Sequence, residues 1–107
     1  MRKTELTEEQ QKKFKWLMDA DTKNEDVEVS EFGYLIWKGG VWEDGTWEYG
    51  NWKGGYWEDG TWEGGTWEGG TWKGGTWIGG LMWSNLKHKY IHVKWDEDKK
   101  EFKEDLK

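Results

Sequence analysis

The chain contains few side chains of the types that carry out covalent or metal chemistry. It has 107 residues, no Cys, two His (His88 and His92) and two Ser. Without Cys there is no thiol nucleophile, no disulfide framework and no Cys-ligated zinc site. Residues 90–95 alternate like a strand, which would separate the two His by roughly 13 Å. We therefore expect no catalytic or metal site built on these residues, and no enzyme activity.

Carboxylates are the remaining candidates. Residues 19–25 are similar to a calcium loop, but Lys23 occupies its fifth position and Ser30 its twelfth, where oxygen ligands are needed. Glu43 with Glu63, or Glu48 with Glu68, would stack only on a coil of twenty residues, as a glycosidase pair would require. A flat convex surface lacks the pocket that shifts a pKa. We predict solvated acidic residues and no cofactor or metal.

The element that must carry any function is a tandem repeat of five residues. Trp recurs at nine consecutive steps from 37 to 77, and a Gly follows each Trp by three residues. A helix would spread these Trp around its axis, and one continuous strand would send them alternately to opposite faces. Short strands separated by Gly bends bring every Trp to one side. The spacing predicts a β-solenoid over residues 30–84.

We expect the Trp side chains to form the interior, because the segment has few aliphatic residues and an exposed Trp stripe would be a large apolar patch. Thr before and Glu or Lys after most Trp suit an outward face. The predicted core residues are Phe32, Trp37, Trp42, Trp47, Trp52, Trp57, Trp62, Trp67, Trp72, Trp77, Met82 and Trp83. The predicted turn glycines are Gly40, Gly45, Gly50, Gly55, Gly60, Gly65, Gly70, Gly75 and Gly80.

The units from Gly45-Thr46-Trp47-Glu48-Tyr49 to Gly75-Thr76-Trp77-Ile78-Gly79 resemble the pentapeptide-repeat family, with Gly as the small residue and Trp as the central one. They also resemble Trp-pentad proteins of bacterial viruses. The family resemblance implies a right-handed, four-sided β-helix with twenty residues per coil. Residues 37–51 and 52–66, however, match best at a shift of fifteen, as a three-sided coil or a duplication of three units would produce. The resemblance favours four sides.

The two ends of a solenoid need caps, since unpaired strands invite aggregation. Thr7 with Gln10 is a capping box that predicts a helix within residues 4–20, with Phe14 and Leu17 on its apolar face. Residues 90–95 predict a strand that closes the last coil. Residues 96–107 are expected to be a charged helix or a solvated extension. The whole is a single, mainly β domain over residues 1–107, with a C-terminal strand and charged tail in residues 85–107.

Composition constrains function only coarsely. A net charge of −6 argues against direct nucleic-acid binding. Neither a signal-peptide pattern nor a membrane span is present. We expect a cytoplasmic protein, or a virion-associated one if a phage encodes it. The leading hypothesis is a non-enzymatic structural or protein–protein interaction module with a protein partner, and association of identical chains through the solenoid ends is an open alternative. The alternatives are a DNA-mimic inhibitor of a nucleic-acid enzyme and a glycan-binding module with exposed Trp.

Overall fold

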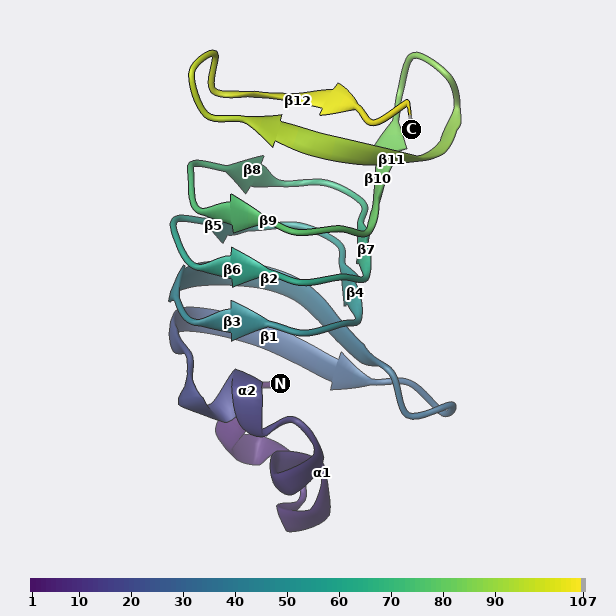
Figure 1. Cartoon of the computed structure of the whole chain (residues 1–107). Helices are drawn as coiled ribbons and strands as arrows, with labels where there is room; N and C mark the ends of the chain where they lie inside the picture. The colour runs from purple at the N-terminus through teal and green to yellow at the C-terminus, as the bar shows by residue number, and fades with distance from the viewer. Residues whose placement is uncertain (107) are drawn as a thin grey trace.

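The computed structural model describes residues 1–106 and shows a β-solenoid of about three turns between two caps (Figure 1). A 3₁₀ turn and two helices precede twelve strands. Their bounds are η1 Lys3–Glu5, α1 Glu8–Lys13, α2 Lys15–Asp19, β1 Asp21–Val29, β2 Leu35–Asp44, β3 Thr46–Trp47, β4 Asn51–Trp52, β5 Tyr56–Trp57, β6 Thr61–Trp62, β7 Thr66–Trp67, β8 Thr71–Trp72, β9 Thr76–Trp77, β10 Leu81–Ser84, β11 Lys89–Asp96 and β12 Glu101–Glu104.

Each coil takes fifteen residues and has three sides. β3, β6 and β9 pair in parallel, with Trp47 opposite Trp62 and Trp62 opposite Trp77. The expectation of twenty residues per coil is therefore wrong, and the fifteen-residue match within the sequence reflects the coil itself. The physical reason is size, because three indoles already fill the cross-section that a four-sided coil would fill with smaller side chains.

The repeat Trp residues form three columns along the solenoid axis. Within a column the ring centroids are 4.7–5.1 Å apart and the planes differ by only 4–8°. Successive Trp along the chain meet edge to face, at 5.6–5.9 Å and 68–79°. Both are favourable aromatic geometries. The columns are Trp37–Trp52–Trp67, Trp42–Trp57–Trp72 and Trp47–Trp62–Trp77.

Most predicted core residues are buried, but two lie at the surface. Eight of the nine repeat Trp are buried, and Trp72 and Met82 are partly buried against them. Phe32 is 79% exposed because it lies in the turn between β1 and β2, before the first coil. Trp83 is 37% exposed because β10 continues as a regular strand, in which Met82 packs inward and the next side chain faces out.

Glycine makes the corners of the coil. All nine predicted turn glycines have positive φ, between 103° and 131°. At Gly60 and Gly65 an added Cβ would lie 2.3 Å from the carbonyl oxygen of the glycine one coil below. Those carbonyls accept backbone hydrogen bonds from the coil above, such as Thr61 N to Gly45 O at 3.0 Å. The corners therefore need glycine both for backbone conformation and for the close approach of successive coils.

The N-terminal cap differs from the single helix expected over residues 4–20. The capping box is present, since Thr7 Oγ1 accepts from Gln10 N at 3.1 Å and Gln10 Oε1 from Thr7 N at 3.0 Å. The helix then breaks at Phe14, whose backbone is non-helical. The break lets Trp16 pack on Trp47, with centroids 5.1 Å apart.

Residues 21–29, which include most of the acidic segment 19–25, form strand β1. This strand pairs antiparallel with β2 and covers the first coil. The reason is Val27, which packs into the core and is only 1% exposed, so that one apolar side chain outweighs the polar composition around it.

The C-terminal cap is a three-stranded antiparallel unit. The strand predicted over residues 90–95 is confirmed as β11, which pairs with β10 and with β12. Residues 96–107 were expected to be a charged helix or a solvated extension, but residues 101–104 form strand β12. The ring centroid of Phe102 lies 5.1 Å from that of Trp77 and 4.7 Å from that of Trp95. Burial of this ring against the last core layer outweighs the charge of its neighbours in the sequence. No helix in residues 1–106 is long and apolar enough to cross a bilayer.

The glycine corners can be tested with a neighbouring pair. Gly65→Ala forces a side chain into a positive-φ corner and should destabilise the fold by at least about 2 kcal/mol. Gly64→Ala places its Cβ at an ordinary 3.6 Å from the nearest atom and should change stability by less than about 0.5 kcal/mol. Urea denaturation of both variants measures the difference. Equal losses would show that the corner conformation is not limiting.

Candidate functional site

The outward residues stack into three straight rows, because the fifteen-residue register repeats each side of the coil. The residue that follows each core Trp faces solvent, and stacked copies lie about 4.8 Å apart by strand spacing. The rows are Lys38–Lys53–Glu68, Glu43–Glu58–Lys73 and Glu48–Glu63–Ile78. The pairs Glu43/Glu63 and Glu48/Glu68 of a twenty-residue coil therefore do not stack, which corrects that expectation.

The rows differ in how their charges are satisfied. Glu43 pairs with Lys23 at 3.3 Å and Glu58 with Lys73 at 4.0 Å. Glu48 and Glu63 form no ion pair within residues 1–106. The β3–β6 side of the solenoid thus presents two carboxylates, flanked by Thr46 and Thr61, with no internal counter-charge.

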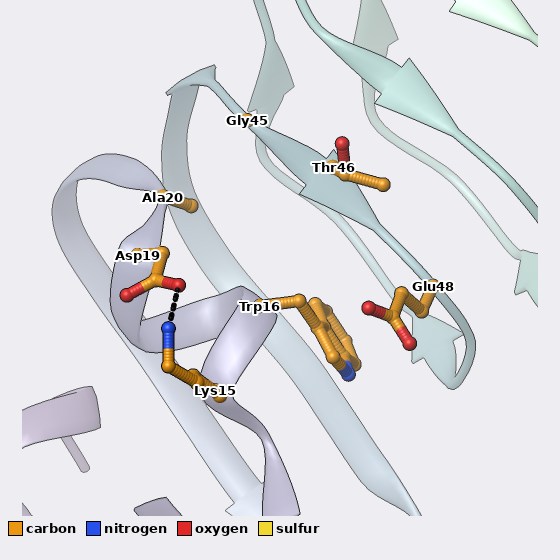
Figure 2. Close-up of a pocket in the computed structure, with 7 residues that line it drawn as sticks. All are labelled: Lys15, Trp16, Asp19, Ala20, Gly45, Thr46 and Glu48. Atoms are coloured by element: carbon orange, nitrogen blue, oxygen red, sulfur yellow. Dashed lines mark hydrogen bonds and ion pairs between the residues drawn. The ribbon is translucent and has the colours of Figure 1, made fainter.

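A hollow of about 290 Å³ lies beside this side, where α2 meets the first coil (Figure 2). Lys15, which lines this hollow, already forms an ion pair, since its Nζ lies 2.8 Å from Asp19 Oδ2. The hydrogen bond to Asp19 raises the pKa of Lys15. Trp16 contributes an apolar wall and Glu48 a carboxylate at the edge. The arrangement suits a contact surface better than an acid–base pair, because Lys15 and Asp19 neutralise each other and Glu48 is left as a single unpaired carboxylate within residues 1–106.

An exposed aromatic pair occupies the surface near the C-terminal cap. Trp83 and Tyr90 lie directly opposite each other in β10 and β11, with ring centroids 5.1 Å apart and planes at 70°. Glu68 lies beside the pair, and the three side chains together line a surface depression. Partial burial, and then the charge of Glu68 and its hydrogen bond, raise the pKa of Tyr90. Sequence reasoning placed Trp83 in the core, yet its position one residue after the repeat register was the available signal.

A second surface hollow lies between the last coil and β11. Trp77, Trp95 and Glu97 line it, together with Asp59 and Thr76. Trp95 Nε1 donates to Glu97 Oε2 at 2.5 Å. The hydrogen bond from Lys100, and then that from Trp95, hold the pKa of Glu97 below its ordinary value. Glu97 is therefore an ionised carboxylate in contact with an indole N–H.

The remaining candidates stay apart. His88 lies in the turn before β11, with φ of 53°, and His92 lies within that strand. Within residues 1–106 no three side chains of the His, Asp or Glu types come together as metal ligands would. Comparison of the chain with protein-family models, curated proteins and solved structures finds no match. The architecture is a β-solenoid with regularly spaced Trp, and it defines a class of fold without assigning an activity.

Glu25 is the one buried carboxylate within residues 1–106, and it holds the N-terminal segment against β1. It is 6% exposed and accepts hydrogen bonds from Lys3 N at 3.1 Å and Thr22 Oγ1 at 2.9 Å. Burial alone would raise the pKa of Glu25, but these hydrogen bonds and the charge of Arg2 bring it below its ordinary 4.5. Its role is structural, because its oxygens face the chain's own donors.

Glu25→Gln should therefore cost about 1–3 kcal/mol at pH 7, since buried donors lose a charged acceptor. The lowered pKa means that this stabilisation is present above the ordinary pKa of 4.5 and is lost as pH falls through the lower folded-state pKa. The stability gap between wild type and variant should thus shrink at pH 3. Glu28→Gln is the matched control on β1, because its exposed pair with Lys38 contributes about 0–1 kcal/mol. A pH-independent gap would contradict the assignment.

Proposed function

We propose that this chain is a non-enzymatic structural or protein–protein interaction module. The supporting observation is that aromatic side chains fill the interior of the coil, while charged residues form straight rows on its outer surface. Backbone hydrogen bonds of 2.7–3.0 Å join each coil to the next, so the rows are held at constant spacing. Such a surface is preorganised, which lowers the entropy that a partner must overcome on binding.

The β3–β6 side is the best candidate for the contact. Glu48 and Glu63 have no ion-pair partner in the described residues 1–106. Basic side chains of a partner would therefore meet carboxylates that need not first be separated from lysines. The other rows mix charges, since Glu68 follows Lys38 and Lys53 in one row, and Lys73 follows Glu43 and Glu58 in the other. Mixed signs favour a protein partner over mimicry of DNA, whose charge has one sign throughout. A bacterial or phage source, a cytoplasmic or virion-associated location, and self-association through the ends belong to the same proposal.

The test is affinity capture from the native source with paired charge variants. Glu48→Lys/Glu63→Lys should remove the captured protein, because reversed charges repel a basic surface. Glu43→Lys/Glu58→Lys, on the neighbouring row, should retain it. Circular dichroism verifies that both variants fold. Robust hydrolytic activity of the purified protein on model substrates would overturn the proposal, as would capture that neither double variant changes.

The aromatic pair supports a second candidate function, glycan binding. Sugar rings stack on exposed aromatic faces, and carboxylates accept hydrogen bonds from sugar hydroxyls. Trp83, Tyr90 and Glu68 place both kinds of group at one surface hollow.

Titration with oligosaccharides, followed by tryptophan fluorescence, tests this candidate. Trp83→Ala should abolish saturable binding. Tyr56→Ala, which removes an aromatic ring that is 50% exposed on β5, should leave it unchanged. If no saccharide binds, or if both variants bind like wild type, the glycan function is excluded.

A further inference from the structure

The tryptophan rings form a continuous path from one cap to the other. The path begins at Trp16, beside the N-terminal hollow, and continues through Trp47, Trp62 and Trp77. The centroids of successive rings on this path are 5.1, 5.1 and 5.0 Å apart. Trp77 contacts Trp72 at 5.6 Å, and Trp72 contacts Trp95 at 6.0 Å. Each end of the path borders a surface hollow: Trp16, which is only 9% exposed, lines the first (Figure 2), and Trp95 lines the second.

The indole N–H groups along this path differ in one respect. The buried N–H groups of nine Trp, Trp16 and eight of the repeat, have no hydrogen-bond partner within residues 1–106. Trp95, in contrast, donates to the carboxylate of Glu97. Trp83, outside the path, donates to the neutral amide oxygen of Asn85 at 2.9 Å. Only Trp95 among these residues thus has an N–H in contact with a proton-accepting anion.

We propose that the Trp core conducts electron holes and delivers them to Trp95, where Glu97 accepts the proton. The oxidant is external: a photo-oxidised metal polypyridyl complex at the N-terminal hollow takes one electron from Trp16, is itself reduced by one electron, and leaves an indole radical cation on Trp16. An electron then moves from Trp47 to Trp16, and the same step repeats through Trp62, Trp77 and Trp72 until Trp95 is the oxidised ring. The Nε1 proton of Trp95 passes to Glu97 Oε2, giving a neutral indole radical and a protonated carboxyl group.

The direction of this transfer follows from charge and proton affinity. An indole radical cation is a strong N–H acid, but the core rings have no base to deprotonate them, so the hole stays mobile. Positive charge in the apolar core is unfavourable, which drives the hole toward the wetter end. Asp59 and Glu97 at the second hollow stabilise a cation there. Phe102 lies against Trp95 but is much harder to oxidise, so it ends the path. This activity is independent of the proposed protein interaction.

Flash photolysis with a tethered photo-oxidant tests the proposal. The chain has no Cys, so Lys15→Cys gives a single attachment point beside Trp16 for a ruthenium polypyridyl complex. The same label at Glu9→Cys, on α1, is the control, because Glu9 does not line that hollow. We expect the label at position 15 to yield oxidised product at Trp95 in excess over Trp83. Trp83 is the more exposed ring, so oxidation governed by exposure would give the opposite order and overturn the proposal.

Two substitutions test whether the hole reaches Trp95 through Trp72. Trp72→Phe interrupts the contact with Trp95 and should lower the yield there by about an order of magnitude. Trp67→Phe removes a ring from the same core layer that contacts Trp72 but not Trp95, and should leave the yield within a factor of about two, because the path does not pass through it. Equal yields from the two variants would overturn the path.

Glu97→Gln keeps every ring but removes the proton acceptor, and at the exposed surface it carries little risk of unfolding. The neutral radical at Trp95 should form more slowly in the transient absorption record, because water must then accept the proton, and the protonated radical cation should live correspondingly longer. Glu101→Gln, on β12 of the same cap, is the control. A neutral Trp95 radical that forms equally fast in both variants would overturn the role of Glu97, even if Trp72→Phe fails to fold.

Discussion

The structure depends on the packing of three indole rings into each layer of a fifteen-residue coil. Each ring stacks on its copy one coil away and meets its neighbours edge to face, so position along the axis and orientation within the layer are both determined. Two-residue strands follow, because a longer side would move the rings apart and leave a void. The narrow cross-section also explains how a chain with few aliphatic residues forms a core, since aromatic side chains bury large apolar areas.

This packing carries an electrostatic cost that the fold tolerates. Indole N–H groups in the core lack conventional acceptors, and each such group costs about 1–3 kcal/mol when it is fully desolvated. Edge-to-face contacts offset part of this cost, because a ring edge directed at a π-face is a weak hydrogen-bond geometry. The corner glycines matter here as well. A Cβ on Gly55 would lie 3.2 Å from Trp37 Nε1, so glycine leaves space for the polar edge of the indole.

The caps determine where the molecule meets other molecules. β1 with α2 covers one end of the coil stack and β11 with β12 covers the other, so both ends of the Trp core are capped, while β3, β8 and β9 each pair with a single neighbouring strand. The surface hollows lie at these junctions, where irregular elements meet a regular one. The candidate contact surface, the aromatic pair and the exit of the Trp path therefore all lie beside a cap, while the middle coil supplies a scaffold of fixed spacing.

Sequence alone determined the five-residue repeat, the inward Trp, the nine glycine corners, the Thr7–Gln10 capping box and the strand around Ile91. These follow from local rules, because side-chain period, positive φ and cap hydrogen bonds depend on residues a few positions apart. Only the tertiary structure decided the number of sides, since that depends on which coil lies above which Trp. It also decided that residues 21–29 and 101–104 are strands and that Trp83 faces solvent. In those places Val27 and Phe102 reach a core built by distant residues, and burial there outweighs local charge.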